Sequence, residues 1–176
     1  MKLTRLGPEA VFHRYLTPRW SHDPLSGAGA ALHGGRFNRP GVPALYLSLA
    51  PETALAEYRQ GSSIVQPATL AAYIADLAMV ADLSAGHDTV DWSADWANWD
   101  CDWRWIARIE KRIPPSWRLG DDVIRAGCAG MLFPSTQHPG GTNLVVFGSN
   151  LTGADSLTVH DPDGRLPKDA RSWPAA

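Results

Sequence analysis

The chain has 176 residues, 44% of them hydrophobic, and its 16 Lys and Arg against 18 Asp and Glu give a net charge of −2. This length and a mean hydropathy of −0.20 predict one soluble globular domain with its own core. The balanced charge argues against a broad nucleic-acid footprint, and the lack of an apolar run of about 18 residues argues against a membrane span.

Hydrophobic periodicity, interrupted by Gly and Pro, predicts the secondary structure. In chain order it predicts a strand at residues 10–16, a long structured loop at 17–43, a strand at 44–49, a helix at 51–60, strands at 69–77 and 79–83, helices at 91–112 and 116–126, and strands at 130–133 and 143–148. A loop of that length inside a domain is usually functional. The elements follow no regular βαβ rhythm, so the predicted class is α+β.

The helix predicted at residues 91–112 carries a tryptophan-rich stripe. Its apolar side chains recur at i, i+4, i+7, i+11 and i+14, namely Trp92, Trp96, Trp99, Trp103 and Ile106. Five tryptophans lie between residues 92 and 105, more than one core face needs. We therefore expect some of them to face a protein partner.

Two features concern where the protein works. The N-terminal residues 1–5 lack the apolar segment of a secretory signal. The two cysteines, Cys101 and Cys128, are too few for a disulfide framework, so both are expected to be reduced. Together these features predict a cytoplasmic protein.

The segment Gly34-Gly35-Arg36 places a guanidinium beside two glycines, just before an apolar strand. Glycine lets the backbone approach a bound group closely. Arg36 offers a planar fork of donors that suits phosphate or carboxylate. Position alone favours a solvated loop arginine, but the segment is a candidate anion site.

Two side chains downstream strengthen the case for a ligand site. Tyr46 points to the opposite face of its strand from both neighbours, where it packs in the core or stacks on a flat ring. Glu57 shares a helix face with the small residues Thr53 and Ala54, which leaves room for a ligand. The ordinary alternative for Glu57 is a surface glutamate.

A second polar group lies where the strand at 130–133 ends. Ser135 is followed by Gln137, His138 and two glycines, and Asn143 begins the next strand. Binding groups are often mounted at strand ends, although a hydroxyl there also commonly caps a turn. No G-x-S-x-G motif surrounds Ser135, so it does not resemble a triad nucleophile.

Motifs for metals and for the common nucleotide folds are absent from the sequence. The six histidines and two cysteines show no H-x-x-x-H or C-x-x-C spacing, which predicts no metal site. Neither the Walker motif nor G-x-G-x-x-G occurs, so a nucleotide would be held in a different way.

The order of the candidate motifs resembles the RES domain family. The matching segments are Gly34-Gly35-Arg36-Phe37-Asn38, Leu45-Tyr46-Leu47-Ser48, Ala54-Leu55-Ala56-Glu57, Leu132-Phe133-Pro134-Ser135 and Asn143-Leu144-Val145-Val146-Phe147. The family is named for its Arg, Glu and Ser, and it supplies the toxins of RES–Xre toxin–antitoxin pairs. The resemblance implies a catalytic domain at residues 10–160, with residues 161–176 as a tail on the surface or partly disordered.

The resemblance also implies a compact α+β fold related to ADP-ribosyltransferase toxins, with NAD+ as substrate and no bound cofactor or metal. Its catalytic residues would be Arg36, Glu57 and Ser135, and its substrate-binding residues Arg14, Gly35, Tyr46 and Asn143. One departure is Phe37, where the family more often has Trp or Tyr.

The implied roles follow from how NAD+ is cleaved. Breaking its N-glycosidic bond builds positive charge on the ribose, which a carboxylate stabilises in the transition state. Glu57 is therefore expected to hydrogen-bond a ribose hydroxyl, and Arg36 to hold phosphate together with N–H groups of the glycine turn. Tyr46 is expected to stack on nicotinamide or adenine, and Ser135 to fix the nicotinamide ribose or its carboxamide.

Several alternatives remain open at this point. Inorganic phosphate, water and a protein side chain are all compatible acceptors, so phosphorolysis, hydrolysis and ADP-ribosyl transfer to a protein are alternatives. A non-catalytic module that binds a nucleotide, or a partner protein through the tryptophan-rich segment, is another hypothesis. The expected partner is an Xre-type antitoxin, in a hetero-oligomer or alongside a homodimer, with no direct contact with nucleic acid or membrane.

Overall fold

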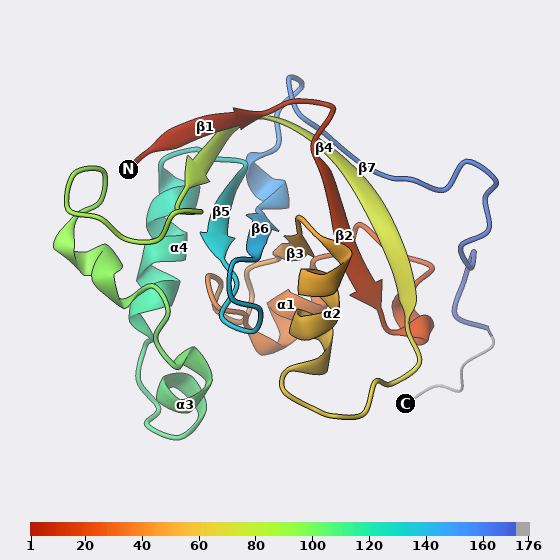
Figure 1. Ribbon diagram of the computed structural model, residues 1–176, viewed down its shortest axis with the longest axis horizontal. Coiled ribbons are helices and arrows are strands. Elements are labelled where there is room, and N and C mark those ends of the chain that lie inside the picture. Colours follow the sequence, from red (N-terminus) through yellow and green to blue (C-terminus); the bar gives the residue numbers. More distant parts are fainter. Residues whose placement is uncertain (172–176) are drawn as a thin grey trace.

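Seven strands of the computed structural model, which describes residues 1–171, form one sheet that closes on itself (Figure 1). The strands are β1 (Leu3–Leu6), β2 (Val11–Leu16), β3 (Leu45–Ser48), β4 (Thr69–Asp82), β5 (Gly130–Pro134), β6 (Thr142–Val146) and β7 (Ser156–Val159). Pairing runs from β4 through β2, β3, β6 and β5 back to β4, and only the β4–β5 pair in this circuit is parallel. β1 and β7 also pair with β4.

The 14-residue strand β4 closes the circuit by pairing with both of its ends. Residues 69–74 pair with β2, and residues 80–82 pair with β5. Between these stretches the register with β1 shifts, because Thr4 lies opposite Val80 but Leu6 lies opposite Leu77. An extra residue in one strand bends it. The prediction of two strands at 69–77 and 79–83 was therefore wrong: one bent strand spans both ranges.

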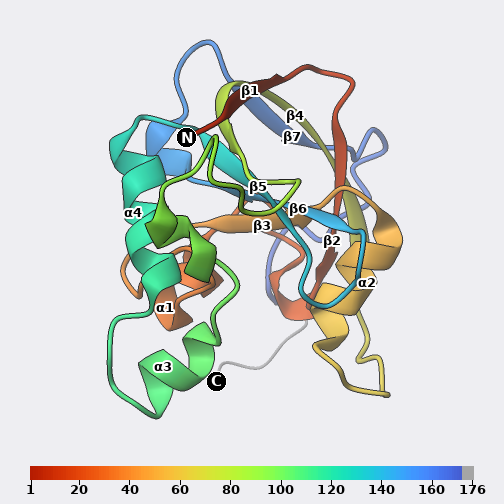
Figure 2. The same ribbon diagram turned by 60° about the vertical axis from the view of Figure 1, so that its left-hand side comes forward.

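Within residues 1–171, four helices complete a domain of the predicted α+β class. They are α1 (Ala28–His33), α2 (Pro51–Arg59), α3 (Trp103–Arg108) and α4 (Pro115–Arg125), with 3-10 turns η1 (Pro18–Trp20), η2 (Ala94–Asn98) and η3 (Gly148–Asn150). α2 begins at a proline, whose fixed φ suits a first turn, and ends where Gln60 turns left-handed with φ 47°. In Figure 2, α4 lies on the left and α2 on the right of the sheet.

Two apolar clusters lie on opposite faces of the closed strands. The inner cluster includes Phe12, Leu47, Tyr73, Leu77, Leu144 and Val146. The outer cluster includes Phe37, Trp96, Val123, Met131, Val145 and Phe147. Successive residues of β6 alternate between the two clusters, as the two-residue period of a strand requires. The outer cluster therefore joins α4 and the tryptophan-rich segment to the sheet.

The prediction of one helix over residues 91–112 was wrong. The chain forms η2, breaks, and begins again at α3, where the Asp102 side chain accepts a hydrogen bond from the Trp105 N–H at 3.1 Å. Trp92 and Trp96 are buried with ring centroids 4.3 Å apart, whereas the Trp103 ring lies 6.4 Å from Trp117 of α4. The tryptophans bury at two places along α4, and Asp102 caps a new helix. These two effects outweigh the 3.6-residue apolar period that favoured one continuous helix.

The remaining predicted elements agree with the structure within about two residues. The strands at 10–16, 44–49, 130–133 and 143–148 correspond to β2, β3, β5 and β6, and the loop at 17–43 contains η1 and α1. β1 and β7 were not predicted. Residues 172–176 of the predicted tail lie outside the described residues, so the division at residue 160 stays a prediction. Among residues 1–171, no helix has the length and apolarity to cross a membrane.

Gly120 tests how closely α4 approaches the loop that carries Arg36. A Cβ at Gly120 would overlap the carbonyl group of Phe37. Although Ala favours a helix over Gly by about 1 kcal/mol, we expect Gly120→Ala to lower the free energy of unfolding by about 1–3 kcal/mol. Urea denaturation measures this change.

The matched control is Gly153→Ala, whose added Cβ meets no atom within 4 Å. Its free energy of unfolding should change by less than about 0.5 kcal/mol. A Gly120→Ala variant more stable than the wild type would contradict the close packing of α4 on this loop.

Candidate functional site

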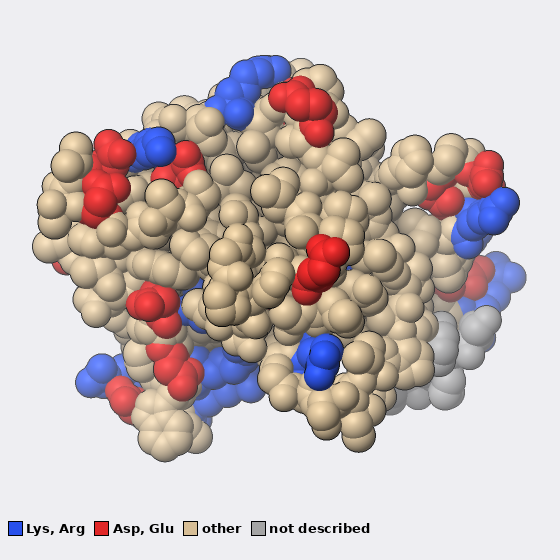
Figure 3. Space-filling view, viewed as in Figure 1, with Lys and Arg blue, Asp and Glu red and all other residues tan. Residues whose placement is uncertain are grey.

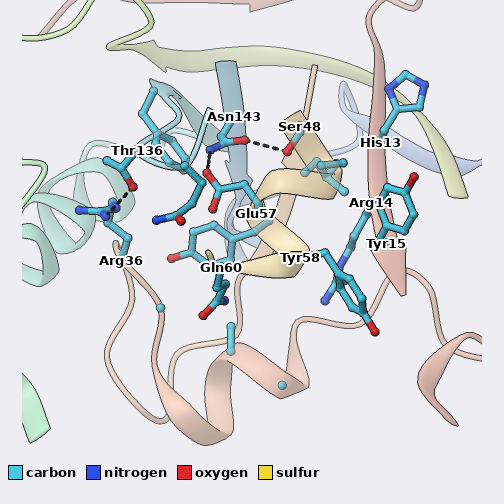
Figure 4. A pocket seen from close by; sticks show the side chains of 18 of the residues that line it. His13, Arg14, Tyr15, Arg36, Ser48, Glu57, Tyr58, Gln60, Thr136 and Asn143 are labelled. Atoms are coloured by element: carbon cyan, nitrogen blue, oxygen red, sulfur yellow. Dashed lines mark hydrogen bonds between the residues drawn. The ribbon is translucent and has the colours of Figure 1, made fainter. Parts of the chain in front are cut away.

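A cavity of about 430 Å³ opens where β2 and β3 separate (Figure 4). The two strands share one residue pair, His13 opposite Ser48, and diverge beyond it. α1, α2, α3 and the turn after β5 complete the walls. The volume lies within the range of about 300–1,000 Å³ that is typical of small-molecule sites.

Glu57 extends from α2 into this cavity (Figure 4). Its Oε1 accepts hydrogen bonds from Asn143 Nδ2 at 2.6 Å and from Ser135 Oγ at 2.8 Å. Within residues 1–171 no hydrogen bond reaches Oε2. One carboxylate oxygen is therefore fixed by the protein, and the other is left for a ligand.

The donors to Glu57 are themselves held by the sheet and the following turn. Ser48 Oγ donates to Asn143 Oδ1 at 2.7 Å, which directs the Asn143 amide N–H towards Glu57. Ser135 Oγ accepts from the N–H groups of Gln137 and His138 at 3.1 and 2.9 Å. Ser135 is buried beside Glu57 rather than in the cavity wall. Ser48, Asn143, Ser135 and Glu57 form one hydrogen-bond network. Because each of these side chains has a partner in it, the orientation of Glu57 is set before a ligand arrives.

Arg36 is anchored by backbone released at the break between η2 and α3. Its Nη1 donates to the carbonyls of Cys101 and Trp99 at 3.0 and 3.4 Å, and its Nη2 donates to Thr136 Oγ1 at 3.0 Å. A continuous helix would have used these carbonyls within itself. The broken helix therefore supplies the acceptors that hold the guanidinium at the cavity.

Tyr46 closes the glycine turn on the cavity side. Its hydroxyl donates to Asn38 Oδ1 at 2.8 Å and accepts from the Phe37 N–H at 2.9 Å, and burial raises the pKa of Tyr46. A Cβ at Gly35 would lie 2.6 Å from this hydroxyl, so only glycine fits there. The Gly35 N–H donates to the Asn38 carbonyl at 2.9 Å. Gly35 therefore shapes the wall by its missing side chain, with its N–H already occupied.

Two further arginines bring positive charge to the cavity. Burial lowers the pKa of Arg14, which lies on β2, although the neighbouring Tyr73 opposes the shift. Arg104 lies on α3 with its guanidinium 4.5 Å from the centre of the Trp103 ring, and burial, then Arg108 and Arg36, lower its pKa. Within residues 1–171, Arg14, Arg36 and Arg104 form no salt bridge. Figure 3 shows Lys and Arg side chains near α3, with Asp and Glu side chains among them.

Two tyrosines add a flat wall at the same cavity. Tyr15 of β2 and Tyr58 of α2 are stacked, with ring centroids 5.8 Å apart, and both line the cavity (Figure 4).

His13 also lines the cavity, and its buried Nδ1 has no hydrogen-bond partner within residues 1–171. In that described part of the chain, no group of three or more His, Cys, Asp or Glu side chains is arranged to hold a metal ion.

The structure brings the predicted site residues to one place. Those that line the cavity are Arg14, Gly35, Arg36, Tyr46, Glu57 and Asn143, with Ser135 behind Glu57. Sequence reasoning missed Ser48, Arg104 and the tyrosine pair. Ser48 ends the quoted Leu-Tyr-Leu-Ser segment, and this position was a usable signal. Arg104 was hidden because the predicted single helix assigned its neighbours to a core stripe.

These features define a class of protein: an α+β domain whose cavity combines one oriented carboxylate with three arginines that form no salt bridge within residues 1–171. A model of the RES domain matches residues 11–169, so the chain belongs to the RES domain family. This match confirms the resemblance found in the motif order.

Comparison with solved structures agrees with this assignment at the level of the fold. The chain is similar to a chain in the crystal structure of the M. tuberculosis MbcT–MbcA toxin–antitoxin complex. The TM-score is 0.59 and the identity is 23%, and the alignment covers 89% of this chain and 84% of that chain. A search of curated proteins found no significant match.

Tyr46→Phe tests the hydroxyl that closes the glycine turn. The variant leaves the Phe37 N–H and Asn38 Oδ1 without this partner, so the free energy of unfolding at neutral pH should fall by about 1–3 kcal/mol. Because burial raises the folded-state pKa, the wild type loses stability as pH rises above the unfolded value of about 10. The gap between the wild type and the variant should therefore narrow at alkaline pH.

Urea denaturation at neutral pH and above about pH 10 measures both effects. Tyr58→Phe is the control, since its hydroxyl makes an exposed hydrogen bond to the Pro67 carbonyl. This control should lose less than about 0.5 kcal/mol. A constant gap at all pH values would show that Tyr46 ionises normally in the folded protein.

Proposed function

We propose that this chain cleaves the nicotinamide–ribose bond of NAD+ and acts as the toxin of a toxin–antitoxin pair. The observation that carries the proposal is Glu57, one oxygen of which is held by Ser135 and Asn143 in a cavity lined by three arginines. Membership of the RES domain family and the fold similarity to a chain of a toxin–antitoxin complex support it.

The charges of the cavity suit the charges of NAD+ at each stage of the reaction. The diphosphate is anionic, so the positive charge of the arginines around the cavity attracts it. Nicotinamide leaves with the electron pair of the broken C–N bond, and positive charge develops on the ribose. Glu57 stabilises that charge, which is largest in the transition state.

The carbon that loses nicotinamide then bonds to an oxygen nucleophile. Water gives ADP-ribose and releases a proton, whereas inorganic phosphate gives ADP-ribose phosphorylated at the same carbon. In this scheme Glu57 is the catalytic residue, and Ser135 and Asn143 are positioning residues that fix its Oε1. The stacked Tyr15 and Tyr58 offer a face to nicotinamide or adenine.

Glu57→Gln tests the carbon–nitrogen cleavage directly. The Gln amide oxygen can still accept from Ser135 and Asn143, so the fold and melting temperature should be retained. We expect nicotinamide release to fall by about 10²-fold or more, because the negative charge at the ribose is lost. Glu52→Gln, at an exposed position in the first turn of the same helix, is the matched control and should keep full activity.

The same assay, run with and without inorganic phosphate, identifies the acceptor from the products. Full nicotinamide release by Glu57→Gln would contradict the role given to Glu57. Label from adenine-labelled NAD+ that stays on a protein band would instead support ADP-ribosyl transfer. No nicotinamide release by the wild type would contradict NAD+ cleavage and favour a non-catalytic binding module.

An Xre-type antitoxin is the proposed partner. Next to the cavity, α3 and the residues after it expose Trp105, Ile109 and Ile113, each more than half accessible. Exposed apolar side chains in one stretch are typical of a protein interface.

Expression of the chain alone should arrest growth, and co-expression with the antitoxin should restore it. Wild-type protein that allows growth as fast as the Glu57→Gln variant does would contradict the toxin role.

A further inference from the structure

Arg36 has little hydrogen-bonding capacity left for a ligand. A guanidinium has five N–H donors. Both hydrogens of Arg36 Nη1 are used by the carbonyls of Trp99 and Cys101, and one hydrogen of Nη2 is used by Thr136. Three of the five donors are therefore committed to the protein itself.

Arg104 lines the same cavity and shows the opposite pattern. Within residues 1–171 its guanidinium makes no hydrogen bond and no salt bridge. Its carbon Cζ lies 4.5 Å from the centre of the Trp103 ring. A cation over an aromatic face is held without using its N–H donors. Arg104 is an exposed residue that lines the cavity, so its five donors are used by no protein group and are open to solvent and to a ligand.

Two other arginines add positive charge around Arg104. Arg108 lies one helical turn further along α3, with its Cζ 5.8 Å from the centre of the same Trp103 ring. Burial lowers the pKa of Arg104, and the charges of Arg108 and Arg36 lower it further, against the smaller opposing effects of Glu57 and Asp102. Like charges at i and i+4 destabilise a helix. A bound anion would relieve this repulsion.

The backbone connects the two arginines. Arg36 holds the carbonyls of Trp99 and Cys101, and α3 begins only two residues later at Trp103. Arg104 is the second residue of that helix. The contacts of Arg36 therefore fix the backbone directly before the Asp102 cap of α3, and with it the position from which Arg104 reaches the cavity.

We propose that Arg104 binds the diphosphate group of the ligand, and that Arg36 acts as a positioning residue by anchoring the start of α3. The identity of the ligand as NAD+ rests on the proposed function. The chemistry recognised by Arg104 is a diphosphate attached to a nucleoside. This assignment moves the phosphate contact, which the sequence led us to expect at Arg36, to Arg104.

Calorimetric titration with ADP, with adenosine as the probe that lacks phosphate, tests the role of Arg104. We expect Arg104→Ala to weaken ADP binding by about tenfold or more, because a charge-assisted contact is lost. Adenosine binding should change by less than about twofold. The matched control is Arg108→Ala, which removes the same charge from the same helix but lies outside the cavity wall, and should change ADP binding by less than about twofold.

A double-mutant cycle tests the positioning role of Arg36. Arg36→Ala should weaken ADP binding when Arg104 is present, and should have less than about a twofold effect when Arg104 is Ala. Thr136→Val removes one anchor of Arg36 at an exposed position, and should follow the same pattern with a smaller loss. A purely structural role of Arg36 would not depend on Arg104.

Three outcomes would overturn the inference. They are wild-type protein that binds ADP no better than adenosine, Arg104→Ala protein that binds ADP as tightly as the wild type, and an Arg36→Ala effect independent of Arg104. ADP binding does not require NAD+ cleavage, so the two proposals fail separately. Loss of ADP binding in Arg104→Ala together with no nicotinamide release by the wild type would keep the diphosphate site and contradict the proposed function.

Discussion

The closed circuit of strands is the constraint on which the site depends. β4 is long enough to pair with β2 at one end and with β5 at the other, so the strands between them must curve around the inner apolar cluster. β2 and β3 keep only one residue pair in that circuit, His13 opposite Ser48. Their divergence opens the cavity. Burial of Phe12 and Tyr73 inside the circuit thus contributes to the site without touching it.

The same closure explains how one carboxylate oxygen of Glu57 is held. Ser48 and Asn143 are register partners on β3 and β6, so their side chains emerge on the same face, towards α2. The Asn143 amide can then bridge Ser48 and Glu57. A buried polar network of this kind is stable only when each member is satisfied. The sheet register, rather than any local motif, therefore orients the carboxylate.

Much of the fold could be predicted from the sequence where Pro and Gly mark the ends of an element or where apolar residues alternate clearly. Pro51 and Gly61 bracket α2, and the alternation of residues 10–16 gives β2. The tryptophan-rich segment could not be predicted from its period, because Trp92 and Trp103 bury against different parts of the molecule. The order of Arg36, Glu57 and Ser135 indicated the family. Ser48 and Arg104 depend on strand register and on the helix break, which a one-dimensional pattern does not contain.

The distribution of ion pairs supports a ligand for the cavity. Exposed arginines such as Arg5 and Arg39 pair with Asp76 and Asp121, so the chain does supply carboxylates where it needs to neutralise charge. Among residues 1–171, Glu57 is the only carboxylate that lines the cavity. Its hydrogen bonds go to Ser135 and Asn143, not to an arginine. Unpaired cations that repel one another reduce the stability of the empty protein. A ligand that brings its own negative charge removes this repulsion, and its binding should therefore be coupled to the order of α3.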